Sequence, residues 1–172
     1  MRKIISIIVV ALLSTQSFVY GQPGGDECND PKYAYAGVNS FSTLLATPSF
    51  PEPDDAMCAG TSLEWNASPD IWFEFVPTSS GLHTFTTCDV TSYDTSIVLY
   101  EGNCSNQVAC NGDGIGSTGC QSYYSAIEYS LSNGVTYYIR IGGWQGDVGE
   151  GTLTIDPSSG GNNIWYVDID NT

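Results

Sequence analysis

The sequence predicts an all-β fold, an antiparallel β-sandwich held together by disulfides. Short segments of alternating apolar and polar residues recur along the chain, separated by turns rich in glycine and serine. No segment carries apolar residues at the 3.6-residue spacing of an amphipathic helix. Six cysteines, an even number, are typical of an exported domain that is cross-linked by about three disulfides.

The first 21 residues have the composition of a secretory signal peptide. Arg2 and Lys3 give a positive start, an apolar run covers residues 4–13, and Gly21 offers a small residue at the expected cleavage site. The run is shorter than the roughly 20 residues that span a bilayer. We therefore expect a protein that is secreted or displayed at the cell surface, with no membrane span.

The chain beyond residue 21 is strongly acidic. It holds all 19 Asp and Glu residues but only two strong bases, Lys32 and Arg140. Nucleic acids and anionic membranes are bound through clustered Lys and Arg, so neither is an expected partner. One folded domain is predicted over residues 22–156, which is long enough to bury a core.

Eight segments have the length and alternation of β-strands. They are residues 38–45, 71–76, 82–87, 95–100, 107–110, 123–131, 135–141 and 151–155. A long exposed loop is expected over residues 47–60, where three prolines stand beside three acidic residues. Ser132-Asn133-Gly134 is the best tight-turn signal, because Asn-Gly tolerates positive φ.

The alternation also assigns faces to the strands. Side chains two residues apart share a face, which predicts a core of Ile71, Phe73, Phe75, Ile97, Leu99, Tyr137, Ile139, Ile141, Leu153 and Ile155. By the same rule Arg140 points away from this core, and we expect it to face solvent, where an acidic residue could pair with it. His83 shares strand parity with Phe85, which favours a partly buried packing role.

The end of the chain changes in composition. Residues 157–163 are rich in Ser, Gly and Asn, which is typical of a linker. Residues 164–172 then begin like a new strand. We expect the start of a second domain there, because linkers join domains; a last edge strand of the same domain is the alternative.

The cysteines allow many pairings, which the sequence alone does not separate. We prefer Cys28–Cys58, Cys88–Cys120 and Cys104–Cys110, a nested rather than an interlaced set. The chain has one histidine and no CxxC pair, so a zinc site is not expected.

A series of motifs resembles a known family. They are Glu27-Cys28-Asn29-Asp30, Pro69-Asp70-Ile71-Trp72-Phe73-Glu74-Phe75, Ser80-Gly81, Tyr93-Asp94-Thr95, Ala109-Cys110-Asn111-Gly112-Asp113, Gly134-Val135-Thr136-Tyr137-Tyr138-Ile139-Arg140-Ile141-Gly142-Gly143 and Gly151-Thr152-Leu153-Thr154-Ile155. In order and spacing they resemble the bacterial pre-peptidase C-terminal (PPC) domain, in the cysteine-bearing form of large secreted proteins. Residues 164–170 resemble the opening strand of the right-handed β-helix domains that often follow in such proteins.

The resemblance implies a jelly-roll-like sandwich appended to exported enzymes and adhesive proteins. Members are usually non-catalytic, and some bind calcium, collagen or polysaccharide. Function differs between members, so the fold does not fix it here.

The resemblance also implies a calcium site near the N-terminus. Glu27, Asn29 and Asp30 match positions that hold calcium in relatives, and Asp70 matches an acid that completes the shell. Cys28 inside the motif is a departure, since a disulfide could clamp this segment in place of the ion. A solvated acidic segment tied down by Cys28 is the alternative.

A second oxygen-rich cluster could form from Asp94, Asn111 and Asp113. These residues could hold calcium, which prefers oxygen ligands, if their loops share one end of the sandwich. Asp and Asn also favour turns through their own backbone hydrogen bonds, which is the simpler interpretation.

The sequence offers no good candidate for catalysis. A Ser–His–Asp triad would have to use His83, and no GxSxG motif is present. Flat aromatic rings in loops or at strand ends could instead contact a ligand, because such rings stack on sugar faces or fill protein pockets. These candidates are Trp144, Tyr33, Tyr35 and Tyr124.

We therefore predict a non-enzymatic extracellular module that binds or positions, stiffened by calcium if an ion is present. Its expected partners are an extracellular polymer, either polysaccharide or protein, or neighbouring domains of the same protein. A carbohydrate-binding module that uses loop aromatics and a purely structural spacer are the alternatives.

Overall fold

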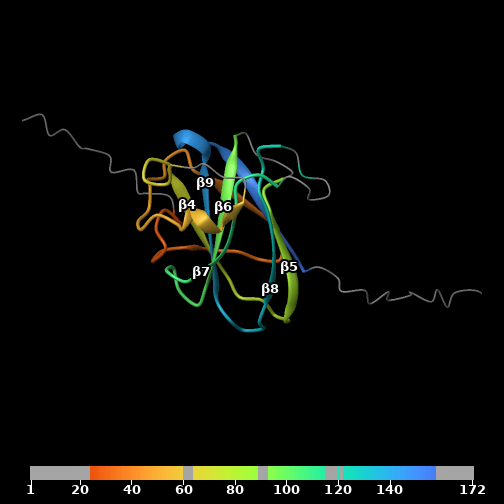
Figure 1. Ribbon diagram of the computed structural model, residues 1–172. Coiled ribbons are helices and arrows are strands. Elements are labelled where there is room, and N and C mark those ends of the chain that lie inside the picture. The colour runs from red at the N-terminus through yellow and green to blue at the C-terminus, as the bar shows by residue number, and fades with distance from the viewer. Residues whose placement is uncertain (1–23, 60–63, 89–92, 115–119, 121, 158–172) are drawn as a thin grey trace, which may run out of the picture.

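Two β-sheets lie face to face around an apolar core in the computed structural model (Figure 1). The structure describes residues 24–59, 64–88, 93–114, 120 and 122–157. The predicted signal peptide, nearly all of the predicted linker and the predicted second domain lie outside the described residues. Among the residues that are described, no helix has the length and apolar composition of a membrane span.

The described chain contains ten strands and two short 3₁₀ helices. These elements are β1 (Lys32–Tyr33), β2 (Gly37–Ser42), η1 (Asp55–Met57), β3 (Cys58–Ala59), β4 (Asp70–Phe75), β5 (Gly81–Thr86), β6 (Thr95–Glu101), β7 (Gln107–Asn111), β8 (Ala126–Leu131), β9 (Tyr137–Gly143), η2 (Trp144–Gly146) and β10 (Glu150–Pro157). All eight predicted strands are present, with ends displaced by a few residues. The two-residue strands β1 and β3 are too short for an alternation signal and were not predicted.

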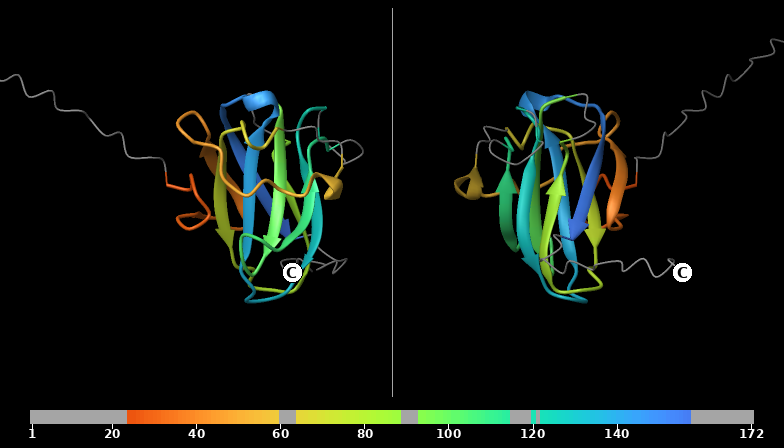
Figure 2. Two further views of the ribbon diagram at one scale, coloured as in Figure 1. Left: turned by 60° about the vertical axis from the view of Figure 1, so that its left-hand side comes forward. Right: turned by 90° about the vertical axis from the view of Figure 1, so that its right-hand side faces the viewer.

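The strands form sheet A, in the order β1-β4-β9-β6-β7-β3, and sheet B, in the order β2-β10-β5-β8 (Figure 2). All pairs between long strands are antiparallel. The short strands β1 and β3 add parallel edges to sheet A. The eight long strands have the order of a jelly roll, in which the chain passes repeatedly from one sheet to the other. The predicted jelly-roll-like sandwich is confirmed.

The predicted tight turn is present but joins different sheets. The Val135 N–H donates to the Ser132 carbonyl at 3.2 Å, and Gly134 has a φ of 76°. The turn leads from β8 in sheet B to β9 in sheet A, so it crosses the sandwich instead of forming a hairpin.

The predicted core is confirmed. Each of its ten residues is at most 5% exposed, and they belong to one apolar cluster between the sheets. Sheet B adds Phe41, Phe85, Ile127 and Leu131 to this cluster. His83 is also buried, and its ring meets the ring of Phe75 edge to face at 6.0 Å, so its packing role is confirmed.

The outer face of sheet A is covered at its centre. The chain between β2 and β3 crosses in front of β9 and β6 (Figure 2, left). Under this crossing segment lies a second buried cluster that includes Trp65, Trp72 and Tyr100. Arg140 on β9 is fully buried there. The alternation places Arg140 on the correct face, but the expectation that it meets solvent is wrong, because a segment distant in sequence covers that face.

The disulfides are Cys28–Cys104, Cys58–Cys110 and Cys88–Cys120. Of the preferred pairing, Cys88–Cys120 is confirmed and the other two bonds are wrong. The reason is again the covered face of sheet A. The N-terminal segment reaches the turn between β6 and β7, and β3 pairs with β7 so that Cys58 faces Cys110. Two disulfides therefore tie the covering segments to one hairpin.

Candidate functional site at the loop end of the sandwich

Three loops meet where β6 begins and β7 and β9 end, and we call this region the loop end. The Trp144 N–H donates to the Asp94 carbonyl at 3.1 Å, and the Asp147 N–H donates to the Trp144 carbonyl at 2.9 Å. Helix η2, which begins at Trp144, caps this end of the sandwich (Figure 2). The loops carry acidic and aromatic side chains together, which makes the loop end the best candidate for a binding site.

Asp94 is affected by two neighbouring carboxylates at the loop end. The pKa of Asp94 is raised to about 6, first because the carboxyl is partly desolvated, and then because Asp113 and Asp147 repel its negative charge. Asp94 and Asp113 were predicted to converge if their loops share one end of the sandwich, and the structure does bring them near each other. Asp147 was not predicted, since nothing in the sequence indicates which side of the β9–β10 loop turns toward Asp94.

Asn111 has a structural part in this region. Its amide Nδ2 donates to the Asp113 carbonyl at 3.1 Å, and its Oδ1 accepts from the Ala126 N–H at 3.0 Å. Asp113 accepts a hydrogen bond from the Tyr123 N–H at 3.0 Å. These contacts shape the turn after β7, as Asn and Asp often do. Calcium binding by Asp94, Asn111 and Asp113 stays a prediction.

The predicted aromatic residues fall in two separate places. Trp144, 40% exposed, and Tyr124, half-buried, lie at the loop end. Tyr33 and Tyr35 are strongly exposed, but β1 pairs with the Phe73–Glu74 part of β4, away from the Asp70 end that faces Gly142. The structure therefore does not bring these tyrosines together with Trp144.

Tyr123 is an exposed aromatic that was not among the predicted binding residues. Its side chain is 65% exposed, and its φ of 75° lies in the left-handed region that a bulky residue rarely adopts. Its carbonyl accepts from the Thr95 N–H at 3.0 Å, which joins it to the start of β6. Tyr123 was predicted to begin a strand, so it was not considered as a loop aromatic. In the structure it lies in the turn that precedes β8, where its ring is exposed.

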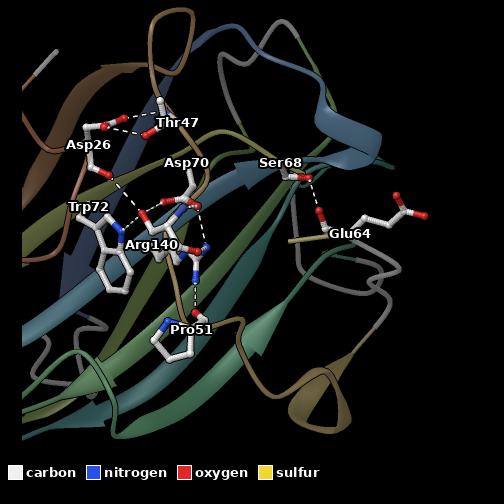
Figure 3. A network of polar contacts seen from close by, with 9 residues as sticks. Asp26, Thr47, Pro51, Glu64, Ser68, Asp70, Trp72 and Arg140 are labelled. Carbon is white, nitrogen blue, oxygen red and sulfur yellow. Dashed lines mark hydrogen bonds and ion pairs between the residues drawn. The ribbon is translucent and has the colours of Figure 1, made fainter. Parts of the chain in front are cut away.

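Asp70 lies in a buried network instead of an open ion site (Figure 3). The Arg140 Nη2 donates to Asp70 Oδ2 at 2.6 Å, and both side chains are fully buried. Ser49 donates to Asp70 twice, from its backbone N–H at 3.0 Å and from its hydroxyl at 2.6 Å. Burial raises the pKa of Asp70, while Arg140 and Ser49 oppose that effect. Its carboxylate oxygens are thus already bonded to Arg140 and Ser49, and calcium binding by Asp70 stays a prediction.

Arg140 holds the covering segment against sheet A. Its guanidinium donates to the Ser49 carbonyl at 2.7 Å and to the Pro51 carbonyl at 2.9 Å. It also lies over the rings of Trp65 and Trp72, at 4.9 and 5.4 Å from their centres, where cation–π attraction is favourable. The residue predicted to be a surface base is therefore the centre of the packing on this face.

The N-terminal motif forms a turn beside this network. The Asp30 N–H donates to the Glu27 carbonyl at 3.0 Å, and the Gly25 N–H donates to the Asp30 carbonyl at 2.8 Å. The neighbouring Asp26, absent from the predicted set, is buried and accepts from the Thr47 backbone and hydroxyl at 2.6 and 2.9 Å. Calcium at Glu27, Asn29 and Asp30 stays a prediction. In the part of the chain that the structure describes, no three carboxylate, histidine or cysteine side chains are grouped so that they could hold a metal ion.

Replacing Asp94 with asparagine is expected to stabilise the protein at neutral pH. An Asp in the unfolded chain ionises near pH 3.9, whereas the pKa of Asp94 in the folded state is about 6. Stability therefore falls as the pH rises through this window, because only the folded state disfavours the charge. Solvent screens this half-buried group, so we expect D94N to gain about 0.5–1 kcal/mol near pH 7.5 and little near pH 4.

Thermal melts in EDTA at both pH values check this expectation, with E128Q on the exposed face of β8 as the control. A D94N protein less stable than the wild type at pH 7.5 would contradict it. Repeating the melts with Ca²⁺ tests the predicted ion. If Ca²⁺ leaves the melting temperature of the wild type unchanged, neither calcium site exists; if it stabilises the wild type but not D94N, the ion binds at the loop end.

Comparisons with known proteins give a likeness of structure. No protein-family model matches the chain. No curated protein matches it either. Among solved structures, the pre-peptidase C-terminal domain of collagenase from Bacillus anthracis is similar, with a TM-score of 0.43 and 10% identity. The match covers 73% of this chain and 94% of that one.

Proposed function

We propose that this protein is a non-catalytic extracellular module that binds or positions a polymer or a neighbouring domain through its loop end. The observation that carries the proposal is the meeting of Trp144 with Asp94, Asp113 and Asp147 on one end of a cross-linked sandwich. A scaffold with three disulfides holds these loops at a small entropic cost for binding. Disulfides of this number are typical of oxidising, extracellular settings.

The buried polar groups support binding over catalysis. His83 is only 4% exposed, and its Nδ1 lies 3.0 Å from the Gly81 carbonyl. A general base must reach a substrate proton, which this packing does not favour. Asp70, the most deeply buried carboxylate of the Figure 3 network, is paired with Arg140. These groups stabilise the fold.

A carbohydrate-binding module is the second candidate, and the exposed rings at the loop end favour it. Trp144 and Tyr123 are both exposed beside carboxylates. Aromatic rings stack on the apolar faces of sugars, and carboxylates accept hydrogen bonds from sugar hydroxyls. Polysaccharide is therefore the first polymer to test, with collagen as the protein alternative.

Replacing Trp144 with alanine is expected to weaken polymer binding at least tenfold, because truncating a central aromatic of a binding site typically costs more than about 1.4 kcal/mol. The measurement is depletion of the protein from solution by insoluble polysaccharides and by collagen. Tyr35→Ala is the matched control, since it removes an exposed ring far from the loop end and should leave binding unchanged. Equal losses in both variants would point to non-specific adsorption, and no binding to any polymer would favour the spacer role.

A further inference from the structure

A concave site lies beside the Arg140 network, where the covering segment meets β6 and β7. It is a cavity of about 330 Å³ between the chain before η1 and the turn joining β6 to β7. Pro51, Pro53 and Met57 line it from the covering segment, the buried Tyr100 from β6 and Gln107 from β7. We call it the proline pocket. Its volume is at the low end for ligand sites, which suits a single side chain of a partner.

The walls of the proline pocket are fixed before any ligand arrives. The Asp54 N–H donates to Gln107 Oε1 at 2.8 Å, and Gln107 Nε2 donates back to the Asp54 carbonyl at 3.0 Å. This pair joins residues 53 positions apart. The Pro51 carbonyl is held from below by Arg140 at 2.9 Å. The Cys58–Cys110 bond ties the segment after η1 to β7. A preformed pocket loses little conformational freedom on binding.

The charge around the pocket is negative. Glu52 and Asp54 line it, and Asp55 follows directly in η1. Burial raises the pKa of Asp55, and repulsion from Glu52 and Asp54 raises it further, so this rim carries excess negative charge. Arg140, the nearest strong base, is neutralised by Asp70 beneath the segment. A cationic ligand would relieve this repulsion.

We propose that the proline pocket binds an arginine side chain of a partner protein. The guanidinium is planar, packs flat against apolar surfaces and forms forked hydrogen bonds with carboxylates, which suits the proline-lined wall and the acidic rim of this pocket. Its aliphatic stem would cover the apolar surface of Met57 and Pro53. This site is separate from the loop end and goes beyond the function proposed above.

The test uses the blocked peptide acetyl-Gly-Arg-Gly-amide, with citrulline in place of arginine as the uncharged control. We expect amide NMR shifts at Asp54 and Gln107 that saturate with the arginine peptide and are absent with citrulline. The double variant E52Q/D54N should bind about tenfold more weakly, since each exposed charge pair contributes modestly. Asn at position 54 can still accept the Ala56 N–H that caps η1.

The control variant is E128Q, which removes an exposed carboxylate from sheet B and should change the affinity less than about twofold. Three results would overturn the proposal. They are equal binding of the citrulline peptide, an equal loss in E128Q, and shifts confined to the loop end or absent at millimolar peptide. W144A should bind the peptide normally, which separates this site from the polymer site.

Discussion

Replacing Arg140 with alanine is expected to lower the free energy of unfolding by about 3–5 kcal/mol. The guanidinium is fully buried, pairs with Asp70 at 2.6 Å and donates to the Ser49 and Pro51 carbonyls. Its removal leaves the Asp70 charge buried without its cation and two carbonyls without a donor. Such losses are large because water cannot replace the missing partners. Urea denaturation of purified protein measures the change.

Three further variants make this result interpretable. Lys32→Ala removes the other strong base from a more exposed position and should cost less than about 0.5 kcal/mol. Adding D70N to R140A should recover part of the loss, because the buried charge is then gone. R140K retains a charge but not the forked donors, so an intermediate loss is expected even if R140A fails to fold. An R140A protein within about 1 kcal/mol of the wild type would contradict the role assigned to this network.

Arg140 also shows where prediction from sequence succeeds and where it fails. The two-residue period of a strand correctly placed Ile139 and Ile141 on one face and Arg140 on the other. The two-residue period is a local property of the strand. It therefore predicts which face of the sheet a side chain lies on, but not whether that face is buried. Whether the outer face meets water depends on a segment some 90 residues earlier, whose Ser49 and Pro51 carbonyls bind Arg140. No local sequence pattern in either segment predicts the contact between Arg140 and these carbonyls.

The candidate site at the loop end could likewise be predicted only in part from the sequence. The Asp94 and Asp113 loops could be placed at one end of the sandwich, because the ends of neighbouring strands meet there, and the structure brings these acids near each other. Asp147 and Tyr123 could not be foreseen, since their positions depend on the detailed course of two irregular loops. The proline pocket could not be predicted from the sequence either, because it depends on a contact between Asp54 and Gln107, which are distant in the chain.

Removing the Cys28–Cys104 disulfide by the double substitution C28S/C104S is expected to cost about 4.5 kcal/mol in the chain-entropy model. The bond joins residues 76 positions apart, so it greatly restricts the unfolded chain. It also fixes the N-terminal segment, which contacts β4 through the Gly25 carbonyl and the Trp72 N–H at 2.6 Å. Urea denaturation measures the loss, and C58S/C110S, with a separation of 52, is the comparison and should cost about 4 kcal/mol.

The same variant distinguishes the two pairings. If Cys28 pairs with Cys104, the substitution removes both ends of one bond, and the folded C28S/C104S protein has no free thiol. If the nested pairing were correct, it would remove one end from each of two bonds and leave Cys58 and Cys110 reactive. These two cysteines face each other across β3 and β7, so the structure requires them to be bonded already. Thiol titration under denaturing, non-reducing conditions decides the matter. Two free thiols per molecule would overturn both the connectivity and the argument that the disulfides anchor the covering segments to the β6–β7 hairpin.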